Sequence, residues 1–115
     1  MEIINLTPHP ITLRDSNGTD TVINPSGTVA RVSATPGMLG YVGGVPVPVA
    51  RPDIYGNVEG LPKAQQGTIY IVSAMVGQHI KNRPDVLLPG TGPQDGAIRN
   101  EKGHIVAVTR LKECN

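Results

Sequence analysis

Phenylalanine and tryptophan are absent from this sequence of 115 residues, and three tyrosines, Tyr41, Tyr55 and Tyr70, are its only aromatic residues. The apolar residues make up 38% of the chain and are almost all valine, isoleucine, leucine and alanine. Branched side chains lose less χ1 freedom in strands than in helices. The composition therefore favours a fold that is mostly β.

Charge and cysteine are also scarce. The net charge is +1 and the basic residues are scattered, whereas nonspecific nucleic-acid binding needs a basic stripe with stacking aromatics. Cys114 is the only cysteine, so we expect no internal disulfide, an exposed thiol near the end of the chain and a reducing compartment. The first ten residues lack the features of a signal peptide, and no apolar run approaches ~20 residues. We therefore expect a cytoplasmic protein that binds neither nucleic acid nor a membrane.

Catalytic and metal-binding patterns are missing as well. His9, His79 and His104 are not spaced with a second histidine or a cysteine as metal ligands are. The nine acidic residues form no recognisable acid–base pair, and there is no nucleophile elbow or zinc-protease motif. We therefore predict no catalytic residues, no metal and no cofactor, in a protein that binds rather than catalyses. His9 and Asp95, as distant partners, are the only basis for an alternative interpretation as a small hydrolase.

The residues that are present predict a series of short strands. Alternating apolar residues on both sides of Asn17-Gly18 predict a hairpin, which residues 28–33 would extend into a β-meander. The continuous apolar run of residues 68–73 predicts a strand covered on both faces. Residues 96–99 and 104–111 alternate about the turn Asn100–Gly103 and predict a second hairpin.

A short helix is predicted directly after the buried strand. Ser73 suits its N-cap, residues 74–82 would form it, and Pro84 would end it, with Arg83 extended, before a strand over residues 85–88. The residues at helical spacing that we expect on its buried face are Met75, Val76, His79 and Ile80. The sum is an α+β fold, mostly β: a small sheet of hairpins with one short helix after a central buried strand, in a single domain of residues 1–115.

The middle of the chain, residues 35–67, is dense in glycine and proline. Within it, Pro46 and Pro48 alternate with valines, and proline lacks the N–H that a central strand donates. This segment therefore predicts a long loop or arm, with an edge strand or a polyproline-like stretch. Loops of this length in small domains are often functional or form interfaces, so we expect a homo-oligomer in which the segment packs on a second subunit.

The stretch PGTGPQDG, residues 89–96, is the candidate ligand loop. Its glycine spacing misses the dinucleotide fingerprint by one residue, and a hairpin strand rather than a helix follows it. If strands 68–73 and 85–88 are parallel neighbours, however, this loop, Ser73 and the helix N-terminus lie at one sheet edge, where ligands commonly bind. Free helix N–H groups would meet an anion there.

Several side chains are candidates for contacts with a nucleotide. Thr91, Gln94 and Asp95 offer hydrogen bonds to a ribose or a base edge, and Arg83 and Arg99 could pair with phosphates. His9 lies between Pro8 and Pro10, in a stiff segment beginning at Thr7 that costs little to order on binding. The alternative is that these residues have no ligand: they only cap the helix, form turns or lie exposed to solvent. The full predicted ligand-binding set is Thr7, His9, Ser73, Arg83, Thr91, Gly92, Gln94, Asp95 and Arg99.

Five stretches together resemble a family of small proteins from tailed phages, prophages and phage-rich metagenomes. They cover nearly the whole chain except residues 35–57, and they are INLTPHPITL, PSGTVARV, GLPKAQQGTIYIVSAMV, RPDVLLPGTGP and AIRNEKGHIVAVTRL. The resemblance implies a phage origin and action in the cytoplasm of an infected bacterium. It supplies no catalytic residues.

A phage origin leaves three functions open. The first is an anti-defence protein that binds a nucleotide or ADP-ribose-type immune signal and sequesters it without cleavage. The second is a minor structural or assembly protein of the virion. The third is the small hydrolase, acting on a nucleotide.

Overall fold

A four-stranded sheet forms the centre of the molecule in the computed structural model, which describes residues 1–114. Its strands are β1 (Glu2–Asn5), β8 (Thr68–Ile71), β9 (Val86–Pro89) and β12 (Leu111–Glu113), in the order β1-β8-β9-β12. The first three strands are parallel, and β12 runs antiparallel to β9. The protein is mostly β with one short helix among the described residues, which confirms the predicted fold class.

The core is built around β8. Tyr70, Ile71 and Val72 are buried, as the apolar run predicted, and β8 is an inner strand between β1 and β9. The apolar side chains packed into the same cluster are Leu6, Ala30, Val76, Ile80 and Val86. With no large aromatic residue except Tyr70, this aliphatic cluster is small.

The helix α1 (Ala74–Gly77) is a single turn, shorter than predicted. After Gly77 the chain tightens, because His79 and Ile80 each donate a backbone hydrogen bond three residues back rather than four. Gly77 is a poor helix former, but Leu88 packs so closely against it that a Cβ would clash. The predicted buried face is wrong for Met75 and His79, which are both exposed.

Both predicted hairpins are confirmed. β2 (Ile11–Arg14) pairs with β3 (Asp20–Ile23), and β10 (Ile98–Arg99) pairs with β11 (Ile105–Ala107). In the second hairpin the N–H of Asn100 bonds the carbonyl of His104, so the turn lies at the predicted residues.

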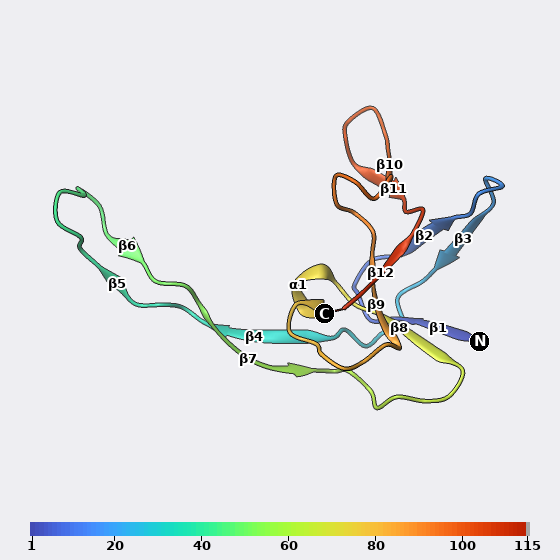
Figure 1. Ribbon diagram of the computed structural model, residues 1–115, viewed down its shortest axis with the longest axis horizontal. Coiled ribbons are helices and arrows are strands. Elements are labelled where there is room, and N and C mark those ends of the chain that lie inside the picture. The colour runs from blue at the N-terminus through green and yellow to red at the C-terminus, as the bar shows by residue number, and fades with distance from the viewer. Residues whose placement is uncertain (115) are drawn as a thin grey trace.

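The glycine- and proline-rich middle of the chain is a protruding two-stranded arm rather than a loop (Figure 1). Its base pairs β4 (Arg31–Thr35) with β7 (Ile54–Glu59), and nearer its tip β5 (Leu39–Gly40) pairs with β6 (Val49–Ala50). The predicted β-meander is therefore wrong at its third strand, because β4 pairs with β7 and not with β3. The long axis of the molecule is 57 Å and the radius of gyration is 17.5 Å, whereas a compact chain of this length would have about 13 Å.

Candidate functional site

The loop after β9 lies at the sheet edge where ligands commonly bind in parallel sheets. Tyr70 pairs with Val86 and Ile71 with Leu87 in parallel register, so the carboxyl ends of β8 and β9 share one edge. This is the arrangement on which the predicted site depended. Ser73 follows β8 at that edge, and its Oγ accepts a hydrogen bond from the N–H of Val76 at 3.4 Å, as an N-cap does.

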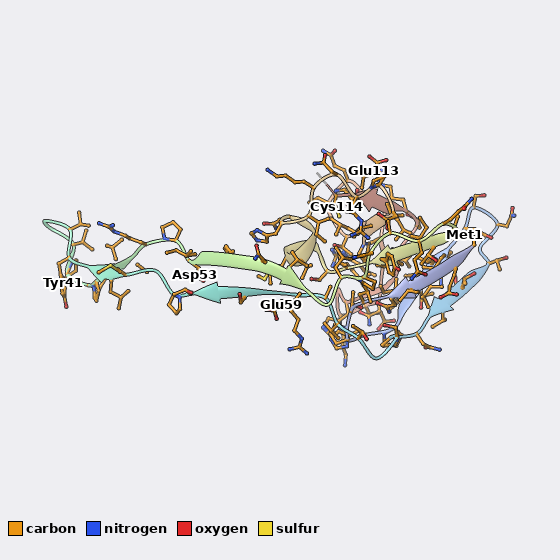
Figure 2. All side chains as sticks on the ribbon, turned by 90° about the horizontal axis from the view of Figure 1, so that it is seen from below. Met1, Tyr41, Asp53, Glu59, Glu113 and Cys114 are labelled. Carbon is orange, nitrogen blue, oxygen red and sulfur yellow. The ribbon has the colours of Figure 1, made fainter. Side chains whose placement is uncertain are left out.

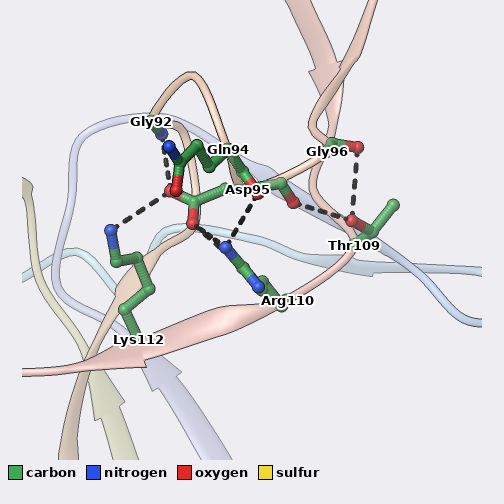
Figure 3. Close-up of polar contacts among 7 residues, drawn as sticks. All are labelled: Gly92, Gln94, Asp95, Gly96, Thr109, Arg110 and Lys112. Carbon is green, nitrogen blue, oxygen red and sulfur yellow. Dashed lines mark hydrogen bonds and ion pairs between the residues drawn. The ribbon is translucent and has the colours of Figure 1, made fainter.

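The carboxylate of Asp95 holds this loop together (Figure 3). Asp95 is 5% exposed, and its Oδ2 accepts a hydrogen bond from the N–H of Gly92 at 2.7 Å and one from Nζ of Lys112 at 3.2 Å. Its Oδ1 accepts from Nε of Arg110 at 3.0 Å and also from Nη2. Nη2 further donates to the carbonyl of Gln94 at 2.9 Å. The loop is thus fastened to the segment that carries both cations.

The local sequence explains why the loop turns here. The N–H of Asp95 bonds the carbonyl of Gly92 at 3.0 Å, closing a β-turn over Gly-Pro-Gln-Asp with Pro93 at its preferred second position. Thr109 completes the attachment, since its Oγ1 donates to the carbonyl oxygens of Asp95 and Gly96, each at 3.2 Å.

The electrostatics of the cluster favour an anion. The hydrogen bond from Arg110 is the main reason that the pKa of Asp95 falls to about 2, with the Gly92 N–H and Lys112 adding to it and burial opposing it. The carboxylate is therefore ionised at neutral pH. The side chains of Arg110 and Lys112 remain 54% and 51% exposed, so two cations face one buried carboxylate and the surplus positive charge reaches solvent.

An open hollow of about 320 Å³ lies over this cluster. Three predicted ligand residues, Gly92, Gln94 and Asp95, line it together with Arg110 and Lys112. Thr91 lines a second hollow of about 160 Å³, which lies between this loop and the mainly apolar residues of β2 and β11.

The two arginines predicted to pair with phosphates lie outside the polar hollow. Arg83 donates to both carboxylate oxygens of Asp85 at 2.9 Å and to the carbonyl of Pro62, so it braces the chain before β9. The hydrogen bond to Asp85 raises the pKa of Arg83. Arg99 donates from Nη1 to the carbonyl of Gly103 at 2.8 Å, across the turn of the β10–β11 hairpin.

Thr7 and His9 belong to a network around the buried Asn5. The Asn5 side-chain amide donates to the carbonyls of His9 at 2.8 Å and Ile23 at 3.0 Å. Its Oδ1 accepts from both the N–H and the hydroxyl of Thr7. The Thr7 hydroxyl is thus engaged inside the protein, while the side chain of His9 is exposed. No hydrogen bond among the described residues joins His9 to Asp95.

Arg110 and Lys112 are the site residues that the sequence analysis missed. The signal was present in TRLKE, residues 109–113, because alternate residues of a strand point to the same face. Two cations at that spacing after an apolar run predict a basic strip on one face. Their acidic partner, Asp95, is 15 residues away from Arg110, a distance at which sequence alone does not reveal the pairing.

Other features bear on what the site can hold. Among residues 1–114 no group of three or more His, Cys, Asp or Glu side chains could hold a metal ion. Within the same residues, no helix has the length and apolar character needed to cross a membrane. Cys114 is half-buried against the core rather than exposed as predicted, and this burial raises the pKa of its thiol.

Comparison of the chain with protein-family models, with curated proteins and with solved structures gives no match in any of the three.

Proposed function

We propose that this protein binds a phosphate-bearing small molecule of the nucleotide or ADP-ribose type in the hollow over Asp95, and sequesters it without chemical change. The observation that carries the proposal is the pair of half-exposed cations, Arg110 and Lys112, anchored on a buried ionised carboxylate. The setting we propose is the cytoplasm of a phage-infected bacterium, where the ligand would be an immune signal.

The donors that remain suit a phosphate. Arg110 uses Nε and Nη2 inside the protein, and Nη1 has no hydrogen-bond partner among the described residues. Lys112 donates one hydrogen bond to Asp95 and has two further N–H groups. Because Asp95 fixes both cations before a ligand arrives, little side-chain freedom is lost on binding. The exposed Gln94 side chain lines the same hollow and offers hydrogen bonds to a ribose or a base.

The same geometry supports binding rather than hydrolysis. A general acid or base needs a pKa near the working pH and a free position for the proton. Asp95 has its pKa held at about 2, and both of its oxygens accept hydrogen bonds from the protein. This environment does not suit the role that the hydrolase alternative gives to Asp95.

Calorimetric titration tests the proposal with three probes: ADP-ribose, a cyclic dinucleotide and inorganic phosphate. We expect one of the two nucleotides to bind, and Arg110→Gln and Lys112→Gln each to weaken that binding at least tenfold. Lys81→Gln is the matched control, because Lys81 is an exposed cation outside the hollow. Binding unaffected by both variants, or no binding of any probe to the wild type, would overturn the proposal. Ligand recovered intact after long incubation separates sequestration from hydrolysis.

The arm supports a second candidate function, a minor structural or assembly protein of the virion. A long ribbon with exposed apolar side chains is suited to inserting between other subunits. Mass spectrometry of purified phage particles decides this alternative: the chain would be present at a fixed copy number if it is a virion component.

A further inference from the structure

The arm, residues 31–59, exposes an unusual amount of apolar surface. Leu39 is 67% exposed and Tyr41 is 78% exposed. The exposed large apolar residues of the arm are Met38, Leu39, Tyr41, Val42, Val45, Val47, Val49, Ile54 and Tyr55. Figure 2 shows the side chains around Tyr41 standing out from the ribbon, far from the rest of the molecule, which we call the head. Scattered apolar residues are normal on a surface, but a contiguous group of this kind marks an interface.

Little in its own chain supports the arm. Only two strands run through it, and a two-stranded ribbon is marginally stable by itself in water. Near the base, the ring of Tyr55 lies 4.6 Å from the ring of His79, which joins the arm to the turn after α1. Beyond that contact the ribbon extends into solvent (Figure 1). A partner that covers the apolar side chains would therefore stabilise the arm.

Charge is almost absent from the arm between its ends. From residue 32 to residue 58 the only charged residues are Arg51 and Asp53. The carboxylate of Asp53 accepts a hydrogen bond from the N–H of Gly37 at 3.3 Å across the ribbon, so it is used within the arm. Depletion of charge is typical of the core of a protein interface.

We propose that the arm binds the arm of a second copy of this chain, with the two ribbons packed face to face about a two-fold axis. A second copy is the one partner present at every folding event. It also repeats the same apolar face, as an isologous contact requires. This inference is independent of the ligand proposed above.

The area available fits a stable dimer. Burial of a large apolar side chain removes on the order of 100 Å² from water. Side chains alternate between the two faces of the ribbon, as Leu39 and Val49 do, so one face offers about half of the total from the nine residues, on the order of 450 Å² of apolar side chain per copy. A standard interface takes about 800 Å² of surface from each partner, of which a little over half is apolar, so one face of the arm supplies about the apolar area required.

The prolines of the arm favour a closed pair over an open stack of strands. Pro46, Pro48 and Pro52 flank β6, and none of them can donate a hydrogen bond to a neighbouring strand. That edge of the ribbon is therefore blocked, as natural edge strands often are. This favours contact through the apolar side chains of the faces over strand addition at that edge.

Sedimentation equilibrium of the full chain between 1 and 100 µM tests this inference. We expect twice the 12.1 kDa chain mass for the wild type. The double variant Leu39→Asp, Tyr41→Asp should sediment as a monomer, because it places two charges in the interface. The rest of the chain should keep its fold, because both positions are exposed and distant from the core, so far-UV circular dichroism should lose at most the contribution of the arm.

The matched control is Val22→Asp, which places a charge at an apolar residue of β3 that is 54% exposed and lies outside the arm. This variant should remain a dimer. A wild-type chain that stays at 12.1 kDa at 100 µM would overturn the inference, and so would a double variant that remains dimeric. A monomeric wild type would direct attention to a partner other than a second copy.

Discussion

At the scale of single residues, Asp95 shows how one side chain can serve both architecture and recognition. Its carboxylate closes the Gly92–Asp95 turn and fixes Arg110 and Lys112 at the start of β12. Removing the charge would therefore loosen the loop and free both cations at once. In the proposed function, ligand affinity depends on a residue that the ligand itself need not touch.

The low pKa of Asp95 gives a testable pH dependence. The ordinary pKa of an aspartate is about 3.9, and in the folded protein it is about 2. Its stabilising contribution is therefore present above about pH 4 and is lost as the pH falls through about 2. We expect the urea midpoint of Asp95→Asn to lie below that of the wild type at pH 6. The difference should shrink steadily as the pH is lowered from 4 to 2.

The control for this experiment is Glu101→Gln, at an exposed turn residue of the β10–β11 hairpin. Its midpoint should follow that of the wild type. A difference between Asp95→Asn and the wild type that stays constant down to pH 2 would show that the ionised carboxylate is not what stabilises the loop.

Sequence reasoning at this scale succeeds where the partners are local. The prediction of Ser73 as an N-cap is confirmed, because its bond to Val76 spans only three residues. Such reasoning fails where the partner is distant. The sequence predicts that Asp95 offers its carboxylate to a ligand, but Arg110 and Lys112 occupy that carboxylate from another part of the chain.

At the scale of elements, buried strands are easier to predict than exposed ones. The apolar run that forms β8 and the turns of both hairpins are visible in sequence, because burial and turn geometry restrict residue type. In the arm, both faces of β4 and β7 are largely exposed, so no alternation of apolar and polar residues marks them. Their pairing with each other is consequently absent from the sequence-based prediction.

The junction of the arm with the head yields a prediction about two glycines. Gly60, directly after β7, has φ +81°, and a Cβ there would lie 2.6 Å from the carbonyl oxygen of Val29. Gly67 has φ +78°, but a Cβ at that residue would have no neighbouring atom within 4 Å. Both substitutions to alanine should cost about 1 kcal/mol for the left-handed backbone. Only Gly60→Ala should add steric crowding, for a total of roughly 2–3 kcal/mol.

Urea unfolding followed by circular dichroism measures both free energies. Gly67→Ala serves as the matched control, because it shares the backbone conformation without the crowded neighbour. Equal losses for the two variants would mean that the close approach of Gly60 to Val29 is not a constraint on how the arm joins the head.

At the scale of the whole molecule, the shape does not follow from composition. Glycine and proline mark residues 35–67 as unusual, but the same composition fits a loop folded over the core. The pairing of β4 with β7 and of β5 with β6 extends the segment away from the head instead. The molecule thus combines a small aliphatic core with a long ribbon that has little support of its own.

This contrast predicts two classes of amide in hydrogen exchange. The amides of Tyr70 and Val72 donate to the carbonyls of Asp85 and Leu87 and should exchange only on global unfolding, far more slowly than the amides of the arm. If association with a second copy protects the arm amides from exchange, those amides exchange only in the dissociated monomer. The monomer fraction of a tight dimer falls as the inverse square root of total concentration.

We therefore expect arm exchange to slow about tenfold when the protein is concentrated about a hundredfold, because exchange follows the monomer fraction. The Leu39→Asp, Tyr41→Asp variant should show no such change, since its arms do not associate. Arm exchange in the wild type that is independent of concentration would mean that the ribbon stands alone in solution. Its apolar face would then be free for a partner of another kind.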